Sequence, residues 1–298
     1  FEAEMLGDIT AICQDSAGVT WYGTSSNGII GYEGPLASVK VSAIATTKDG
    51  SIWVGSPQNG LTRIRNGVAT FYSTASDSTH HTMIDDHINA MTCDKQGNLW
   101  IATDGGLQLY NPKLNQFSNY TKEQEKIKTN NITSLLYSRS NKLLMGTSEG
   151  LIIMNISTGE MDYYIGNSNS IQKFTNNYIT QVFEDSRGLI WVGTREGVNV
   201  LNLESDNLDQ ITEKNGNLCN NNICGIAEDQ AHNIWLTTSN GVSRIVVQRN
   251  HEDGTHTYGT YNYTLRDGLQ NDEFNTGAIA TLEDGRVIMG GLNGVNTS

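Results

Sequence analysis

Polar side chains that could bind a ligand lie at two recurring places in this sequence. One place is just before a first short apolar segment, and the other is just after the apolar segment that follows it. The candidates are Arg195, Tyr178, Glu196, Asn177, Asn222, Asn240, Asp86 and His87. Amides, carboxylates and a guanidinium can make paired hydrogen bonds to sugar hydroxyls, and an aromatic ring offers a plane for stacking. Arg195 and Tyr178 are preferred, because their turns do not need these residue types, whereas asparagine before a strand is also a good turn residue.

Candidates for catalysis or metal binding are few. One cluster could supply a base or a metal ligand: His80, His81, Asp85, Asp86 and His87. Its place between two repeated segments predicts a solvated loop instead of a metal site. The acidic pairs at 184–185 and 228–229 recur within a repeated turn motif, which favours turn formation over a hydrolytic pair. The chain has no glycine-rich phosphate loop and no G-x-S-x-G motif. The sequence therefore predicts no catalytic residue, no metal and no cofactor.

Net charge and composition exclude several classes of partner. The formal charge is −13, whereas a nucleic-acid surface needs clustered Lys and Arg, and an anionic membrane also attracts basic segments. No apolar run approaches the roughly 18–20 residues of a membrane helix. The four cysteines form no CxxC pair and are predicted to be unpaired thiols, with a bridge between the nearby Cys219 and Cys224 as the alternative. The opening residues Phe1–Ala3 lack the pattern of a signal peptide, and a first residue other than Met favours a piece excised from a longer protein.

The elements that must position the candidates are set by an internal repeat of about 43 residues (298/7). Seven segments align, at 9–32, 41–64, 88–110, 132–154, 179–201, 223–245 and 276–297. All five tryptophans fall on one aligned position, at Trp21, Trp53, Trp100, Trp191 and Trp235, and a glycine follows six or seven residues later in every copy. Departures from the pattern are local: Thr47 and Leu282 at the turn aspartate, Ser138 and Asn141 in the fourth copy, and His232 in the sixth.

Each copy predicts three short strands joined by tight turns, followed by an aromatic-bearing stretch that can form a fourth strand. Four antiparallel strands per repeat make one propeller blade. The predicted fold is therefore all-β, a single seven-bladed β-propeller of four-stranded antiparallel blades over 1–298, with the tryptophans between neighbouring blades. The seventh copy ends after its third strand, and Phe1–Leu6 is the candidate for its closing strand. Only 32 residues separate Trp21 from Trp53, which predicts a short or absent outer strand in the first copy.

The repeated unit, such as ITQVFEDSRGLIWVGTREGVNVL at 179–201, resembles the two-component regulator propeller repeat over essentially the whole chain. The segments DGLQNDEFN (267–275), DGR (284–286) and GGLNG (290–294) resemble the end of the second propeller in the periplasmic sensor of hybrid two-component systems. In that family, which is common in glycan-degrading gut bacteria, two propellers and a β-sandwich precede a membrane span, a histidine kinase, a receiver and an AraC-like domain. The resemblance implies a sensor fragment with no kinase activity of its own.

The expected function is that of a periplasmic sensor module that binds a glycan-derived oligosaccharide and relays the signal to a histidine kinase outside these residues. The resemblance also implies contact with a neighbouring propeller and a β-sandwich of the same protein, and a homodimer in the full-length protein. It implies no nucleic-acid contact and no membrane insertion by this fragment. Two alternatives stay open: a structural or protein-interaction propeller without a small ligand, and a propeller polysaccharide lyase with a histidine base.

Overall fold

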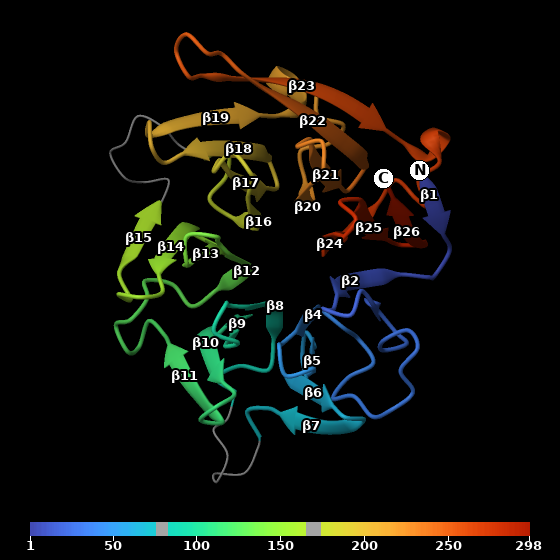
Figure 1. The fold of residues 1–298 in the computed structure, drawn as a ribbon, viewed down its shortest axis with the longest axis vertical. Helices are drawn as coiled ribbons and strands as arrows, with labels where there is room; N and C mark the ends of the chain where they lie inside the picture. The colour runs from blue at the N-terminus through green and yellow to red at the C-terminus, as the bar shows by residue number, and fades with distance from the viewer. Residues whose placement is uncertain (76–82, 165–173) are drawn as a thin grey trace. The chain divides into compact units, whose positions relative to one another are not determined.

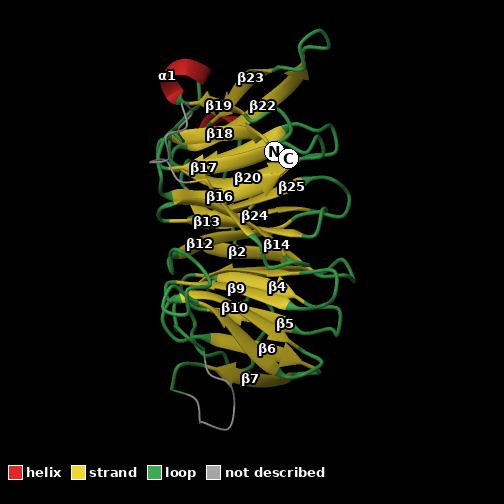
Figure 2. Ribbon diagram, turned by 90° about the vertical axis from the view of Figure 1, so that its left-hand side faces the viewer, coloured by secondary structure: helices red, strands yellow, loops and turns green. Residues whose placement is uncertain are grey.

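The computed structural model describes residues 1–75, 83–164 and 174–298 of the chain. The described residues form two compact units, here called unit 1 (Phe1–Ile9 and Ile165–Ser298) and unit 2 (Thr10–Tyr164). Almost all regular structure is β-strand, with one short α-helix, α1 (Glu213–Gly216), and one 3₁₀ turn at Leu265–Asp267 (Figure 2). No helix in the described ranges is long and apolar enough to cross a membrane.

Unit 1 contains three four-stranded antiparallel sheets (Figure 1). Their strands are β16 (Ile179–Glu184), β17 (Ile190–Thr194), β18 (Gly197–Asn202) and β19 (Asn207–Ile211); β20 (Ile223–Glu228), β21 (Ile234–Thr238), β22 (Gly241–Arg249) and β23 (His256–Tyr263); and β24 (Phe274–Thr281), β25 (Val287–Gly291), β26 (Gly294–Thr297) and β1 (Glu2–Glu4). The strand ahead of the first copy is the outer strand of the last sheet, since β1 pairs antiparallel with β26.

Unit 2 contains three more sheets of the same kind and one smaller sheet. Their strands are β4 (Ala43–Thr46), β5 (Ile52–Gly55), β6 (Leu61–Arg65) and β7 (Val68–Tyr72); β8 (Ile88–Cys93), β9 (Leu99–Thr103), β10 (Gly106–Asn111) and β11 (Gln116–Tyr120); and β12 (Ile132–Tyr137), β13 (Lys142–Thr147), β14 (Gly150–Asn155) and β15 (Met161–Tyr164). The smaller sheet pairs β2 (Ile9–Gln14) with β3 (Thr20–Thr24).

The prediction of four-stranded antiparallel blades is confirmed for six copies. It is wrong for the first copy, which lacks its outer strand, as the spacing of the tryptophans predicts, and also lacks a third strand. That copy forms only β2 and β3, plus one isolated bridge between Gly23 and Ile29. The physical reason is the short spacing after Trp21, which leaves the chain turning through 30–42 before β4 begins at Ala43. Repeated four-stranded meanders of this type are propeller blades, so the chain has an all-β propeller fold.

The turn between the first and second strands is held by an aspartate that accepts from three donors. The Oδ1 of Asp185 accepts hydrogen bonds from the backbone N–H of Arg187 and Leu189, at 2.9 and 3.0 Å. Its Oδ2 accepts from the indole Nε1 of Trp191 at 2.9 Å. Asp15, Asp94 and Asp229 make the corresponding bonds, each with the tryptophan six residues later. The aspartate and the tryptophan of the repeat therefore act as one hydrogen-bonded unit.

Where the repeat departs from its pattern, the aspartate and the tryptophan are mostly replaced together. The fourth copy replaces both partners, with Ser138 and Leu144, and the seventh copy does so with Leu282 and Ile288. Where Trp53 remains without an aspartate, the hydroxyl of Thr47 lies 3.1 Å from the indole nitrogen and accepts its hydrogen. The fourth residue of the turn has a positive φ in every copy, including Asn141 (57°) and His232 (64°) where glycine is absent. The turn geometry thus survives each departure.

The tryptophans pack where the repeat predicts, against the next sheet of the same unit. Trp191 lies in a buried cluster with Ile223 and Leu236 of β20 and β21. Trp53, Trp100 and Trp235 occupy the same place in three further clusters, and Trp21 is half-buried in a fifth. The four cysteines are unpaired, as predicted. Burial raises the pKa of the Cys13, Cys93 and Cys224 thiols.

An arginine extends the cluster around Trp53. The register of β5 and β6 places Arg63 opposite Trp53, with its guanidinium carbon 4.9 Å from the indole centroid. Its Nε donates to the hydroxyl of Ser51 at 2.9 Å, its Nη1 donates to the hydroxyl of Tyr110 at 3.2 Å, and its Nη2 pairs with Asp49. Each side of this partly buried guanidinium therefore has a partner.

Asp49 is expected to make stability depend on acid pH. Burial raises the pKa of Asp49, but hydrogen bonds from Thr47, Ser51 and Arg63 outweigh it and hold the pKa well below its usual value. Because the folded pKa lies below the unfolded value of about 4, this contribution is complete above about pH 4 and is lost as the pH falls toward the folded pKa. Urea denaturation should show a steeper loss of unfolding free energy for wild type than for Asp49→Asn between about pH 4.5 and 2.5. Parallel pH dependences would contradict this assignment.

Candidate functional site

Tyr178 and Arg195, the preferred candidates, lie together in unit 1. Tyr178 directly precedes β16, and Arg195 begins the turn between β17 and β18. The guanidinium carbon of Arg195 lies 4.4 Å from the centroid of the Tyr178 ring, within the range of a cation–π contact. The Arg195 side chain is exposed and Tyr178 is half-buried. A planar cation stacked on a phenol thus faces solvent at one end of this sheet.

Neighbouring threonines position this pair. Thr194 ends β17, and its hydroxyl donates to the carbonyl of Gly197 at 2.9 Å and accepts from the backbone N–H of Glu196 at 2.9 Å. The hydroxyl of Thr175 lies 3.0 Å from that of Thr194, so the loop before β16 is tied to the turn after β17. Because backbone and threonine groups make these bonds, the side chains of Arg195 and Tyr178 stay available for a ligand.

The next sheet of unit 1 repeats the arrangement with amides. Asn222 directly precedes β20, and its Nδ2 donates to the hydroxyl of Ser239 in the turn between β21 and β22 at 2.5 Å. The backbone N–H of Gly197 donates to the carbonyl of Asn221 at 2.7 Å, which joins the first turn to the second loop. Loop 175–178, turn 195–197, loop 219–222 and turn 239–241 are therefore continuous, and are called the unit 1 rim below. The rim brings together Asn177, Tyr178, Arg195, Glu196, Asn222 and Asn240.

The remaining two candidates lie in unit 2. Nδ1 of His87 lies 3.3 Å from Oδ2 of Asp104 in the turn between β9 and β10. The carboxylate of Asp86 accepts from the backbone N–H and the hydroxyl of Thr74, at 2.8 and 2.7 Å. Asp86 therefore holds the loop after β7. His80 and His81 lie outside the described residues, and the described residues contain no group of three or more His, Cys, Asp or Glu arranged to hold a metal ion.

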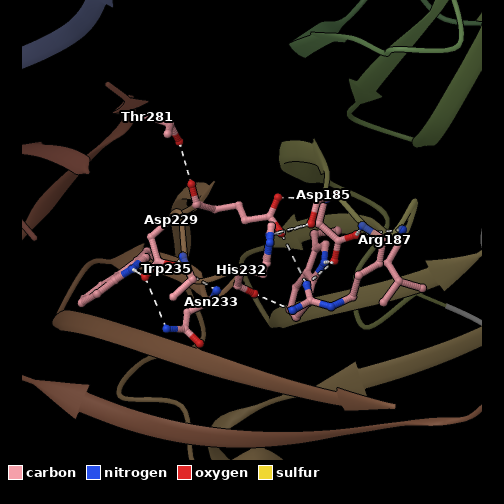
Figure 3. Close-up of polar contacts among 12 residues, drawn as sticks. Asp185, Arg187, Asp229, His232, Asn233, Trp235 and Thr281 are labelled. Atoms are coloured by element: carbon pink, nitrogen blue, oxygen red, sulfur yellow. Dashed lines mark hydrogen bonds and ion pairs between the residues drawn. The ribbon is translucent and has the colours of Figure 1, made fainter. Parts of the chain in front are cut away.

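Three members of the acidic pairs, Asp185, Glu228 and Asp229, serve the turns at the other ends of the strands (Figure 3). Glu228 accepts from the backbone N–H and the hydroxyl of Ser186, at 2.9 and 2.7 Å, so one sheet binds the turn of the sheet before it. Nη1 of Arg187 lies 3.2 Å from Asp185 and 3.5 Å from Glu228. The imidazole Nδ1 of His232 lies 2.9 Å from the same Ser186 hydroxyl. This network occupies the carboxylates of Asp185 and Glu228 with turn contacts, as the repeat predicts.

Sequence reasoning missed the hydroxyl residue that ends the second strand. Thr103, Thr147, Thr194 and Thr238 each donate to the carbonyl of a glycine three residues later and accept from a turn N–H. The signal was present, since a serine or threonine precedes the turn in six of the seven aligned copies. These residues hold each rim turn in register with its own sheet.

One family model matches part of the chain. Residues 82–105 and 173–196 match the model described as two component regulator propeller. Each matched segment runs from the loop before a first strand to the turn after the second strand. The two segments contain six of the eight candidates: Asp86, His87, Asn177, Tyr178, Arg195 and Glu196. A search of curated protein sequences finds no match.

Solved structures match nearly the whole chain at low sequence identity. An extracellular domain described as that of a hybrid two component system, BT3049 of B. thetaiotaomicron, is 17% identical with a TM-score of 0.74, covering 98% of this chain and 40% of that chain. PorZ, a surface component of the type-IX secretion system of Porphyromonas gingivalis, is 15% identical with a TM-score of 0.72, covering 98% and 46%. This chain therefore spans less than half the length of either protein.

A third similar structure is of nearly the same length as this chain. An inactive variant of virginiamycin B lyase from Staphylococcus aureus, solved with quinupristin, is 13% identical with a TM-score of 0.70, covering 99% of this chain and 95% of that chain. Proteins described as a two component system, a secretion-system component and a lyase thus share this architecture. At these identities the likeness establishes the fold, an all-β propeller, and function has to be argued from the site.

Proposed function

We propose that this chain is a seven-bladed propeller, with β2–β3 as an irregular seventh blade, that serves as the periplasmic sensor module of a hybrid two-component system. The module binds a glycan-derived oligosaccharide at the unit 1 rim and has no catalytic activity of its own. The match of segment 173–196 to the two-component regulator propeller model supports this assignment. The likeness to an extracellular domain of a hybrid two component system agrees with it in fold.

The carrying observation is a set of rim side chains with unused hydrogen-bonding capacity. In the part of the chain that the structure describes, no hydrogen bond involves the side chain of Asn177, Tyr178, Arg195, Glu196 or Asn240. Two carboxamides, a carboxylate, a phenol and a guanidinium offer both donors and acceptors, which the hydroxyls of a sugar require. The half-buried ring of Tyr178 adds an apolar surface against which a sugar can pack.

Signal relay follows if the ligand distinguishes two arrangements of the full-length protein. A ligand shifts an equilibrium only by its differential affinity for the two states. We propose that the bound oligosaccharide, together with a neighbouring propeller and β-sandwich, changes how two sensor chains pack in a homodimer. A histidine kinase outside these residues then reads the change. The hydrogen-bonded strands and turns of each sheet suit this role, because a rigid body transmits a contact change without absorbing it.

Arg195→Ala is expected to weaken oligosaccharide binding by about 10–100-fold, because a hydrogen bond to a charged group contributes roughly 1.5–3 kcal/mol. Isothermal titration calorimetry against a panel of neutral and acidic oligosaccharides would first identify a ligand for the wild-type protein. Tyr178→Ala should also weaken binding, because it removes the ring that supports the guanidinium. Arg249→Ala is the matched control, since Arg249 is an exposed arginine at the far end of β22 and its loss should leave the affinity unchanged.

The same titrations separate the alternatives. If no oligosaccharide binds, even with the neighbouring domains of the full-length protein present, direct glycan sensing is wrong and a protein-interaction propeller takes its place. If a polysaccharide is depolymerised with the appearance of double-bond absorbance, the lyase alternative replaces the sensor. If a ligand binds but Arg195→Ala and Tyr178→Ala bind it as well as wild type does, the site lies away from this part of the rim.

A further inference from the structure

Arg244 of unit 1 is set among aromatic rings and has no counter-ion within the described residues. It lies on β22 between Trp235 of β21 and Tyr261 of β23. Its guanidinium carbon is 4.9 Å from the ring centroid of Tyr261, 5.9 Å from that of Trp235 and 6.0 Å from that of Tyr263. Its Nε is buried and has no hydrogen-bond partner, and no ion pair involves Arg244 in the described residues. Such a group is costly to leave unpaired, so it calls for an explanation.

The repeat contains a reference for this arginine. Arg63 occupies the same register, opposite Trp53, as Arg244 does opposite Trp235. Three other sheets place Leu109, Ile153 and Val200 at this position, opposite Trp100, Leu144 and Trp191. An apolar residue therefore satisfies the packing of a blade, and neither arginine is required by the fold.

The rings around the two arginines also correspond. Tyr72 lies with its centroid 6.0 Å from that of Trp53 and is in turn 5.5 Å from Phe117. Tyr263 lies 5.8 Å from Trp235 and is 5.1 Å from Phe1, which packs from the neighbouring sheet of unit 1. The same aromatic box is thus built twice, once in each unit.

The two boxes differ in what satisfies the guanidinium. Asp49, four residues before Trp53, pairs with Arg63, whereas Ala231 stands four residues before Trp235. In the first box the hydroxyl oxygen of Tyr110 accepts from Arg63, whereas the small Ser298 stands at the corresponding position after β26. Arg244 therefore lacks both the carboxylate and the phenol that Arg63 has. Tyr261 lies opposite Arg244 and is 52% exposed, and Phe1, which packs on Trp235 and Tyr263, is 40% exposed.

We propose that Arg244, backed by Tyr261, Tyr263 and Phe1, is a docking site for an aspartate or glutamate side chain of a partner protein. The incoming carboxylate takes the place that Asp49 holds on Arg63 and accepts from the terminal Nη2 of the guanidinium. The rings hold the guanidinium plane in position, which lowers the ordering cost of binding. We expect a protein carboxylate to bind here because a carboxylate, that of Asp49, fills the equivalent box in this chain. The site uses none of the rim residues and does not depend on glycan binding.

The test is an NMR titration that follows the Nε–H resonance of Arg244 and the indole resonance of Trp235. The probe is N-acetyl-aspartyl-glycinamide, which copies the Asp49–Gly50 pair of the filled box. We expect a saturable shift of the Arg244 Nε–H, which reports a carboxylate bound at the neighbouring Nη2, with a dissociation constant on the order of 1–10 mM, as suits so small a ligand. The Arg63 Nε–H should not move, because its box is filled. The asparaginyl analogue at the same ionic strength should shift neither resonance.

Two variants and a control sharpen the titration. Ala231→Asp should supply the carboxylate from within the chain, shifting the Arg244 Nε–H without the peptide and reducing the peptide response at least about ten-fold. Arg244→Leu should fold, since Leu109 occupies the same position in another sheet, and should abolish the peptide-induced shift of the Trp235 indole. Arg249→Leu, at an exposed arginine of the same strand, should leave the response unchanged.

An absence of any saturable shift at both reporters would overturn the proposal, as would an equal shift with the asparaginyl analogue. A response to glucuronate without a response to the aspartyl peptide would replace a protein partner by an acidic sugar. An unchanged peptide response in Arg244→Leu would place the carboxylate elsewhere on the surface.

Discussion

Replacing Asp185 with alanine is expected to lower the free energy of unfolding by about 3–5 kcal/mol, measured by urea denaturation. The aspartate is fully buried, and its carboxylate accepts from the Trp191 indole at 2.9 Å and from two backbone N–H groups. It also lies 3.2 Å from the guanidinium of Arg187. Alanine would leave the buried indole donor and both backbone donors without acceptors, and the arginine without its closest carboxylate.

Two further variants test whether the Asp–Trp pair is the cause. Asp15→Ala removes the same three bonds at a solvent-accessible turn beside the half-buried Trp21, and should cost less than about 1.5 kcal/mol because water replaces the lost acceptor. The double variant Asp185→Ser with Trp191→Leu recreates the Ser138–Leu144 pair of the fourth copy. Its loss of unfolding free energy should be smaller, by about 1–2 kcal/mol, than the sum of the losses of Asp185→Ser and Trp191→Leu measured singly. Additive losses would show that the two residues are not coupled.

The strands and turns could be predicted because each copy carries local signals at a fixed spacing. The aspartate turn, the tryptophan strand and the glycine turn recur, and these features place the first three strands of six sheets. The fourth strand is less predictable, because it pairs only along one edge and needs little beyond extended backbone. Accordingly β19, whose sequence NLDQI contains no aromatic residue, carries no signal. In the first copy, the short spacing between Trp21 and Trp53 predicts a missing outer strand but does not predict the path that residues 30–42 take.

The candidate site was predictable where topology decides and unpredictable where single side chains decide. The loop before a first strand and the turn after a second strand must share one end of a sheet, and this rule brings Tyr178 to Arg195. Nothing in the sequence indicates that Thr74 donates two hydrogen bonds to the carboxylate of Asp86, because only the folded chain brings the two residues into contact. Arg244 was missed for a related reason: the register has to be known before its missing counter-ion becomes visible by comparison with Arg63.

Replacing Gly197 with alanine is expected to cost more than about 3 kcal/mol of unfolding free energy, again by urea denaturation. Gly197 has a φ of +109°, and an added Cβ would lie 2.6 Å from the carbonyl oxygen of Ile211 on the outer strand β19. Backbone cannot move aside as a side chain can, so the turn must distort or β19 must separate from β18. The same obstacle faces Gly106 and Gly241, where a Cβ would lie 2.7 Å from the outer-strand carbonyls of Tyr120 and Tyr263. Hydrogen exchange should therefore show β19 amides losing protection first in the variant.

Gly28→Ala is the matched control, because it alters the same aligned glycine in the copy that has no outer strand. The atom facing its Cβ is the flexible Cδ1 of Leu36 at 2.8 Å, and its φ of +66° lies in the left-handed region that non-glycine residues can adopt at modest cost. The expected loss is about 1 kcal/mol. If Gly28→Ala costs as much as Gly197→Ala, the recurrence of glycine reflects backbone conformation alone. If it costs much less, the φ of +109° and the facing carbonyl of the fourth strand together exclude a side chain at Gly197, and glycine is required most where an outer strand closes the blade.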